Sequence, residues 1–404
     1  MDWSCAGGAT RHRGGAGSLL ALFVQIVCVG FFLGSERTLV PLLGHQAYHV
    51  AAGAVALGIT AFGVAKGPAN ALAGWWVDRA GPRRVVWSGW AMGGLAVAAF
   101  LVPGWSGAVL AYGLLGGNQG LTWTTLVTAQ IVQAGPRRGG TAIGLNEALG
   151  VLSTAGGTAL AGLMAGRFGL RGTIVGMGAA AVLAGGLLAW TLPPIIRAES
   201  TKPKSPVLPL VWMKDRHWGW ATLGAVLDKA ADAAVWVGAP LLLTAHGVAV
   251  ATVGVLTASY TAVYGLGQGV AGWVADQWGR KGPLVGGFLA LALGLATFAR
   301  ASGPGGWAAG LVLGGLGLAA VSPALSAVVS DVAPPSRRGT WLGAYRFWRD
   351  GSYALWGVVF GGLFTTLGGA LAFGVIGGLC ALFAGALIPG LPATTVRGAR
   401  GRSR

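Results

Sequence analysis

Charged side chains interrupt the apolar stretches of this 404-residue chain at ten positions. A charge at the depth of a lipid bilayer costs at least ~2.5–3.5 kcal/mol, so such residues are typical of ion pairs, proton carriers and solute-binding sites. Five of the ten are acidic and five are basic, which favours pairing inside a helical bundle. They are Glu36, Arg37, Lys66, Glu147, Asp228, Lys229, Asp232, Arg346, Arg349 and Asp350.

The acidic members are candidates for carrying protons through a membrane, because a carboxyl group removed from water takes up a proton readily. We assign this role first to Glu36 and Asp232, and then to Asp228 and Glu147. If Asp232 carries the proton, its replacement by Asn should abolish pH-driven transport. Purely structural ion pairs, for example between Glu36 and Lys66, remain an open alternative.

Spacing indicates which of these charges share a helix face. Lys229 directly follows Asp228, so on a helix its side chain is turned roughly 100° away from that carboxylate. Arg346 and Asp350 are four residues apart and are expected to pair with each other, which would leave Arg349 freer to meet a solute.

Polar and aromatic residues at helical spacing predict the wall of a solute cavity. Lys66 and Asn70 share one face, and Tyr264 and Gln268 occupy the equivalent face in the second half of the chain. Hydroxyl groups in membrane helices often bond only to the backbone of their own helix. For Thr residues at helical spacing, such backbone bonding is the alternative to contact with a solute. The expected cavity residues are Arg37, Lys66, Asn70, Asn118, Thr122, Trp123, Tyr260, Tyr264, Gln268, Arg346, Arg349 and Asp350.

The composition identifies the elements that must position these residues. Hydrophobic residues make up 54% of the chain, charged residues make up 10%, and the mean hydropathy is +0.67, which are values of a membrane protein. A bilayer needs about 20 apolar residues per span, and each span must be helical to satisfy its own backbone. Twelve such stretches occur, at 18–42, 50–73, 85–103, 107–132, 141–165, 172–195, 218–244, 249–272, 283–300, 306–330, 340–364 and 368–391.

The two halves of the chain repeat each other. The segment 74–84, GWWVDRAGPRR, recurs in degraded form at 272–281, GWVADQWGRK, with an offset of 276 − 78 = 198 between the aspartates. Other landmarks keep nearly the same offset, so the repeat extends along the whole chain. The predicted fold is an all-α integral membrane protein with twelve transmembrane helices in two pseudo-symmetric six-helix bundles.

The net charge is +17, and the basic residues that produce it are distributed as in a membrane protein of defined topology. Twenty Lys and Arg residues fall in the segments on one side of the spans and three on the other, which is the positive-inside asymmetry and places both termini in the cytoplasm. The basic residues form no single patch, which argues against nucleic-acid binding. We expect a basic N-terminus (1–17), a first bundle (18–195), a cytoplasmic linker (196–217), a second bundle (218–391) and a basic tail (392–404).

The repeated loop has its own physical interpretation. Gly74 lacks a side chain where its helix meets a neighbour, which permits close approach. Asp78 can accept hydrogen bonds at the N-terminus of a nearby helix. In the second copy Gln277 stands in the place of Arg79, so a weaker charge network is expected there. A basic turn that only sets topology is the alternative.

This loop pattern, Gly-x-x-x-Asp-Arg-x-Gly-x-Arg-Arg between the second and third spans, resembles the signature of the major facilitator superfamily. With twelve spans and a half-length repeat, the resemblance covers nearly the whole chain. It implies two bundles that rock about a central site lined by spans 1, 4, 7 and 10, and a loop that latches the cytoplasmic side shut against span 11. The latch residues would be Gly74, Asp78, Arg79, Gly81, Arg83, Arg84, Gly272, Asp276 and Arg280.

The expected function is secondary active transport of a small solute by alternating access across the cytoplasmic (inner) membrane. Proton coupling is expected, and antiport that exports drug-like or toxic compounds is slightly favoured over movement of a metabolite or metal species. A receptor or assembly factor that does not transport remains the rival, because a fold does not determine function. No enzyme or cofactor motif occurs; partners would be the solute, protons and the lipid bilayer, with the chain as a monomer. His45, His49 and His246 leave a metal site open as a minor alternative.

Overall fold

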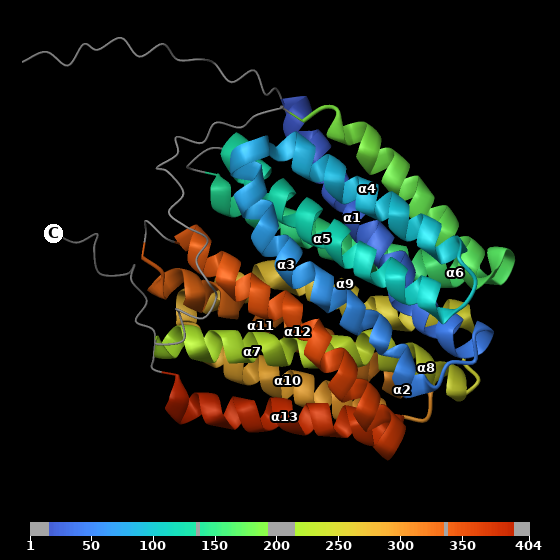
Figure 1. The fold of residues 1–404 in the computed structure, drawn as a ribbon. Helices are drawn as coiled ribbons and strands as arrows, with labels where there is room; N and C mark the ends of the chain where they lie inside the picture. Colours follow the sequence, from blue (N-terminus) through green and yellow to red (C-terminus); the bar gives the residue numbers. More distant parts are fainter. Residues whose placement is uncertain (1–15, 135–137, 193–214, 335–337, 392–404) are drawn as a thin grey trace, which may run out of the picture.

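The computed structural model describes residues 16–134, 138–192, 215–334 and 338–391. These residues are almost entirely helical (Figure 1). The helices of the first half are α1 (Ala16–Leu42), α2 (Ala52–Val55), α3 (Leu57–Ala80), α4 (Pro82–Leu101), α5 (Trp105–Ala134) and α6 (Gly139–Ala189). Those of the second half are α7 (Arg216–Ala233), α8 (Ala239–Ala245), α9 (Val250–Trp278), α10 (Lys281–Arg300), α11 (Pro304–Val332), α12 (Arg338–Leu367) and α13 (Gly369–Gly390).

A helix is found at each of the twelve predicted spans. Two of these spans form the two arms of α6, which meet at Gly169, where φ is +72° and the helix turns back. A π-helical turn, Ala234–Gly238, connects α7 to α8, and the three together form one span. The prediction of an all-helical membrane protein is confirmed.

Eight of the helical stretches are long and apolar enough to cross a membrane by composition alone. Counted with both arms of α6, they account for nine of the twelve predicted spans. The other three spans are α5, α7 with α8, and α12. They are less apolar because they carry many of the charged and amide side chains that the sequence singled out, and a helix that carries such groups must face the interior of the bundle.

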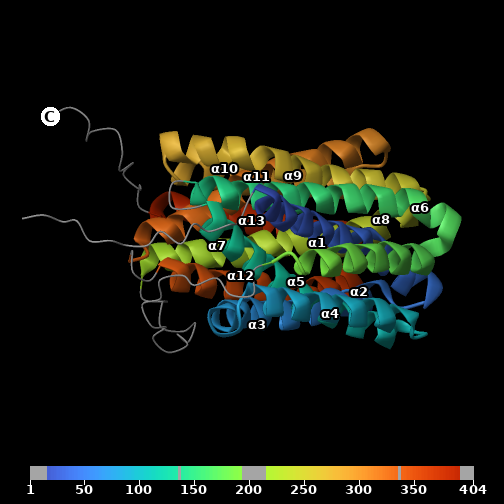
Figure 2. The ribbon, with the colours of Figure 1, turned by 90° about the horizontal axis from the view of Figure 1, so that it is seen from above.

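The helices of the first half lie together, and those of the second half lie beside them (Figures 1 and 2). The two halves meet chiefly where α3 packs on α12 and where α6 packs on α9. We use "the terminal end" for the end of the bundle at which α1 begins and α13 ends, on the left in Figure 1. The predicted polar segments 1–17, 196–217 and 392–404 fall largely outside the described residues.

Close backbone contacts at glycines show where the two halves pack tightly against each other. A Cβ atom added to Gly162 of α6 would lie 2.8 Å from the Cα of Gly254 on α9, and one added to Gly63 of α3 would lie 2.3 Å from the backbone nitrogen of Ala354 on α12. These contacts lie away from the terminal end. Such approach is open only to residues without side chains. The halves are therefore closed against each other on that side.

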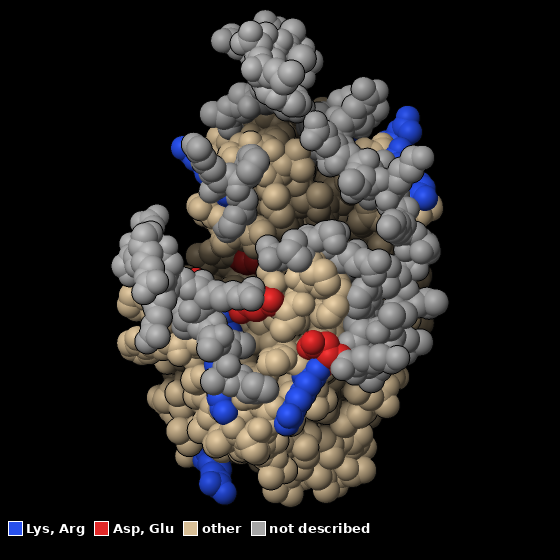
Figure 3. Space-filling view, turned by 90° about the vertical axis from the view of Figure 1, so that its left-hand side faces the viewer, with Lys and Arg blue, Asp and Glu red and all other residues tan. Residues whose placement is uncertain are grey.

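The repeated glycine of the signature loop behaves differently. Among the residues that the structure describes, no atom lies within 4 Å of a Cβ added to Gly74 or to its counterpart Gly272, apart from atoms of its own helix. The expectation that Gly74 permits close helix contact is therefore wrong for this conformation, because the halves are apart at the terminal end. Figure 3 views that end and shows acidic side chains in the depression between the two groups of helices.

Candidate functional site

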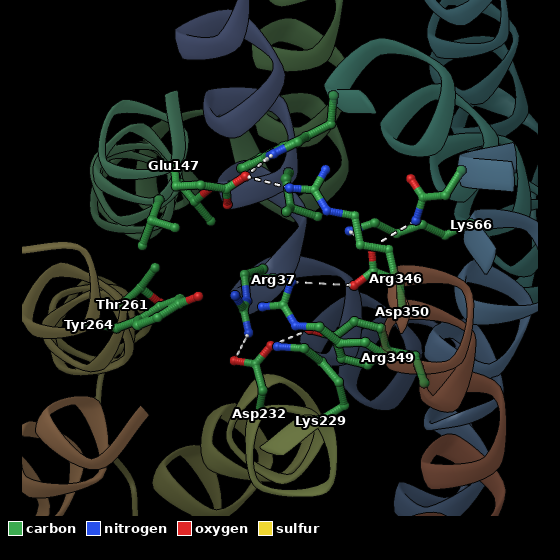
Figure 4. A pocket seen from close by; sticks show the side chains of 16 residues that line it. Arg37, Lys66, Glu147, Lys229, Asp232, Thr261, Tyr264, Arg346, Arg349 and Asp350 are labelled. Carbon is green, nitrogen blue, oxygen red and sulfur yellow. Dashed lines mark hydrogen bonds and ion pairs between the residues drawn. The ribbon is translucent and has the colours of Figure 1, made fainter. Parts of the chain in front are cut away.

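A cavity lies between the two halves and holds about 660 Å³ of empty space, the open mouth included. Helices α1, α3, α5, α6, α7, α9 and α12 contribute to its wall. Its charged and polar side chains point toward one another across the space (Figure 4). Predicted residues that line it are Arg37, Lys66, Asn70, Trp123, Glu147, Asp232, Tyr264, Arg346, Arg349 and Asp350.

Among the residues that line the cavity, the shortest ion pair joins α1 to α7. Nη2 of Arg37 lies 2.6 Å from Oδ1 of Asp232, and both side chains are almost entirely buried. The hydroxyl group of Tyr353 on α12 donates a hydrogen bond to the other oxygen of this carboxylate. The guanidinium of Arg37 also lies 4.6 Å from the ring centroid of Trp236, a favourable cation–π distance.

A second set of charges surrounds Asp350 on α12. Nζ of Lys66 on α3 lies 3.8 Å from Oδ2 of Asp350, and Asn70 donates a 2.8 Å hydrogen bond to the same oxygen. Arg349 lies 3.9 Å from the other oxygen. The amide of Asn70 is held in turn by Thr124 of α5, which donates a 2.8 Å hydrogen bond to it.

A third pair joins α6 to α12. Nη2 of Arg346 lies 3.4 Å from Oε1 of Glu147, and the indole nitrogen of Trp123 on α5 donates a 3.0 Å hydrogen bond to the same oxygen. The predicted pairing of Arg346 with Asp350 is therefore wrong. Both residues lie on α12, and each finds a partner on a helix of the other half.

Arg349, which was expected to be freer, contacts several groups instead. Its side chain lies 3.8 Å from Asp228 and 3.9 Å from Asp350, and it donates a 3.0 Å hydrogen bond to Ser322 of α11. Tyr264 also donates to that hydroxyl group, at 3.1 Å. Arg349 therefore ties α7, α11 and α12 together at the wall of the cavity.

Two of the predicted proton carriers lie behind the cavity wall. Asp228 is fully buried and lies 3.0 Å from Nζ of Lys229. Neighbouring side chains on a helix point roughly 100° apart, but the long lysine side chain reaches back to this carboxylate. Glu36 is 0% exposed, and both of its carboxylate oxygens are buried without a hydrogen-bond partner in the described part of the chain. The alternative of an ion pair between Glu36 and Lys66 does not hold, since Lys66 contacts Asp350.

Four other predicted residues are not among those that line the cavity: Asn118, Thr122, Tyr260 and Gln268. Asn118 donates a 2.8 Å hydrogen bond to the carbonyl oxygen of Gly89, and Thr122 donates to the carbonyl oxygen of Asn118. Asn118 therefore links α5 to α4, whereas the hydrogen bond of Thr122 stays within α5. The alternative that hydroxyl rows serve the backbone therefore holds for Thr122.

Four residues that were not predicted as cavity residues also line the cavity: Lys229, Tyr353, Thr154 and Thr261. Tyr353 follows Arg349 by four residues and Asp350 by three, and helical spacing was the signal that could have found it. The two threonines lie in long apolar helices, where no feature of the sequence separates them from threonines that bond to the backbone.

The second copy of the repeated loop holds a charged network. The guanidinium of Arg280 contacts Asp276 one turn away and lies 3.2 Å from Asp331 at the end of α11. Arg280, one of the predicted latch residues, provides the cation in this copy, and a weaker network than in the first copy stays a prediction. In the first copy Arg79 lies over the ring of Trp75 at 4.2 Å, and the side chain of Asp78 is outside the described residues.

Replacing Arg280 by Gln removes contacts to both Asp276 and Asp331. These carboxylates are largely exposed, so each contact is worth about 1 kcal/mol or less. We expect the thermal stability of the purified protein to change little and the initial rate of solute counterflow to fall by about two- to fivefold. The matched control is Arg300→Gln, at the opposite end of the bundle. An Arg280→Gln rate equal to the control rate would remove this network from the transport cycle.

Comparison with known proteins identifies the architecture. The sequence model of the Major Facilitator Superfamily matches residues 22–227 and 221–403. A nucleoside transporter of known structure, NupG, superposes with a TM-score of 0.79 at 17% identity, covering 92% of this chain and 100% of that one. A D-xylose-proton symporter gives 0.75 at 14% identity, with 94% and 99% covered.

A transporter of the POT family, solved with a thioalcohol-conjugated peptide, also gives a TM-score of 0.75, at 11% identity with 93% of this chain and 97% of that one covered. At these identities the similarity to solved structures establishes the fold alone. A comparison with curated protein sequences finds no match.

Proposed function

This chain belongs to the Major Facilitator Superfamily and is a secondary transporter, and we propose that it couples the movement of a small polar solute to protons by alternating access. One observation carries the proposal: three ion pairs in the cavity bridge the two halves. Arg37 of α1 pairs with Asp232 of α7, and α12 pairs with both α3 and α6 through Lys66–Asp350 and Glu147–Arg346.

Such bridging pairs suit a transporter in which the halves move against each other. When the halves rotate, pairs between them must lengthen or exchange, whereas pairs within one half need not. A solute with polar groups competes for the same charges, so its binding biases the equilibrium between conformations. A receptor that does not transport gains nothing from the desolvation cost of these groups.

Proton coupling is assigned to Glu36. A buried carboxylate without a hydrogen-bond partner is too costly to remain ionised, so this carboxyl group is neutral in the present conformation. It lies next to Arg37, whose ion pair with Asp232 bridges the halves. When the halves separate on the side that is now closed, Glu36 gains access to water and can release its proton. Asp232, held by a cation and a hydroxyl group, is the less suitable carrier.

The wall of the cavity favours a polar solute over an apolar drug. Eight of its lining residues are charged, whereas Leu33 and Val151 supply the aliphatic contacts. Export of drug-like compounds, slightly favoured on sequence, therefore has less support than movement of a polar metabolite. The positive-inside asymmetry supports a cytoplasmic location for the terminal end, so that this conformation opens inward. Location in the inner membrane and a monomeric state are part of the proposal.

Counterflow in proteoliposomes tests this function. Purified protein is reconstituted into vesicles loaded with an unlabelled solute, and uptake of the same labelled solute is followed across a panel of sugars, nucleosides, amino acids, organic acids and cationic drugs. We expect exchange of at least one polar solute, accelerated relative to protein-free vesicles. Folded protein that exchanges no member of the panel would sink the transport assignment and favour the receptor.

A further inference from the structure

The cations that line the cavity outnumber the carboxylates. Five of its lining residues are Lys or Arg, and three are Asp or Glu: Glu147, Asp232 and Asp350. Asp228, buried behind the wall against Lys229 and Arg349, supplies a fourth negative charge. The balance of these groups is 5 − 4 = +1. Both carboxyl oxygens of Glu36 are buried without a hydrogen-bond partner among the described residues, so this group is neutral and does not alter the balance.

A net charge can be tolerated while the cavity is open to water, but not when the cavity closes around its contents. Occlusion removes the water that screens the extra cation, and an uncompensated charge in a medium of low polarity is expensive. A solute that carries one negative charge would restore neutrality in the occluded state. A cationic solute would add to the excess and be disfavoured by like-charge repulsion.

Among the cations, Arg346 is the most available for such a solute. Its side chain is 25% exposed, against 12% for Arg37 and 15% for Arg349. Among the described residues its one polar contact is a 3.4 Å approach to Glu147, although a guanidinium has five N–H donors in a planar fork that matches a carboxylate. Arg346 therefore has unused hydrogen-bonding capacity toward the cavity.

Two neighbours complete a binding site at Arg346. The first is Lys66, whose Nζ lies 3.8 Å from Asp350 and 6.0 Å from the ring centroid of Trp123. The second is Trp123, whose indole nitrogen donates to the same oxygen of Glu147 as Arg346 does. The side chains of Arg346, Lys66 and Glu147 lie near one another on one side of the cavity (Figure 4). Trp123 therefore lies near Lys66 and shares Glu147 with Arg346, and its ring can support the apolar body of a solute.

From this arrangement we propose that the transported solute is a small organic anion whose carboxylate binds to Arg346 and Lys66 in competition with Glu147. The proposal rests on the proposed function, since it names the solute class of the same cavity. It requires that removing the charge of Glu147 and removing the charge of Arg346 have opposite effects on the affinity for the anion, although the two residues form one ion pair. Removing the charge of Glu147 removes a competitor, whereas removing that of Arg346 removes the anion's partner.

Ligand-induced thermal shifts of the purified full-length protein test the proposal. The probes are matched sets of carboxylate, primary amide and primary amine on the same aromatic or aliphatic body, each at about 10 mM. A ligand that binds the folded state stabilises it by mass action. We expect carboxylates to raise the melting temperature and their amides and amines to have little effect. Amines that stabilise as well as carboxylates, or carboxylates that produce no shift, would overturn the proposal.

Three variants separate binding from structure. Glu147→Gln is expected to tighten carboxylate binding several-fold, and Arg346→Gln to weaken it by about tenfold or more. Arg300→Gln, outside the cavity, should match the unmodified protein. Variants of Glu147 and Arg346 that shift affinity in the same direction would contradict competition and indicate a purely structural pair. Should Arg346→Gln fail to fold, Glu147→Gln with Arg346→Gln removes both charges and is expected to fold without binding carboxylates.

The outcomes also separate this proposal from the function on which it rests. Anion-specific stabilisation without counterflow in vesicles would retain the binding site and reject transport. Counterflow of a neutral or cationic solute that is independent of Arg346 would retain transport and reject the anionic substrate class.

Discussion

Asp232→Asn protein is expected to lose solute transport in both counterflow and pH-driven assays. The substitution leaves Arg37 buried in the cavity wall without the carboxylate that lies 2.6 Å away. Removing one partner of a buried pair destabilises a protein by about 3–5 kcal/mol, because the remaining charge is uncompensated. The link between α1 and α7 is lost at the same time. We expect a lower melting temperature in detergent and counterflow reduced by at least about tenfold.

The double variant Arg37→Gln with Asp232→Asn is the matched control for this prediction. It removes both charges, so much of the melting temperature should return, whereas transport should not. The result that would contradict our account is an Asp232→Asn protein with normal counterflow and a selective loss of pH-driven transport. That outcome would make Asp232 the proton carrier, which is the role that the amino-acid sequence alone suggested for this residue.

Glu36→Gln protein is expected to keep counterflow and to lose accumulation of solute in response to a pH gradient. Because Glu36 is fully buried without a hydrogen-bond partner among the described residues, its carboxyl group is neutral here and Gln reproduces its shape and charge. The melting temperature should therefore change little. A Gln side chain cannot release a proton, so accumulation driven by an imposed pH gradient should fall by about tenfold or more while exchange continues.

Glu147→Gln provides the comparison for this second prediction. Glu147 is a cavity carboxylate with a cation and an indole donor beside it, so its substitution should leave the response to a pH gradient in place. Both variants are assayed in the same vesicles with the same solute. Glu36→Gln protein that still accumulates solute against its gradient when protons flow would refute the assignment of proton coupling to Glu36.

Much of the architecture could be predicted from the sequence because its causes are local. A helix must satisfy its own backbone in a membrane, so runs of about 20 apolar residues predict spans without knowledge of their neighbours. The break between two spans was expected between residues 165 and 172, and it lies at Gly169. The superfamily resemblance, which rests on the loop at 74–84, is confirmed by the family match along both halves.

Cavity residues were harder to predict, because helical spacing identifies a face but not what that face meets. Asn118 and Thr122 share a face as expected, yet that face packs against α4 through the carbonyl oxygen of Gly89. Lys229 was not predicted to line the cavity, yet its flexible side chain reaches the cavity wall, since such a side chain can extend beyond the direction of its Cβ atom. Tyr353 was missed although its spacing from Arg349 placed it on the right face.

The sequence by itself determined that this is a membrane protein of two related halves, and that charged side chains lie within its spans. Only the tertiary structure decided which charges meet. Arg346 pairs with Glu147, 199 positions away along the chain, instead of with Asp350 one turn away, and the Glu36 carboxyl group has no hydrogen-bond partner in the described part of the chain. The physical reason is that an ion pair forms where desolvation and geometry allow it. Both depend on how the halves pack against each other, which no local pattern records.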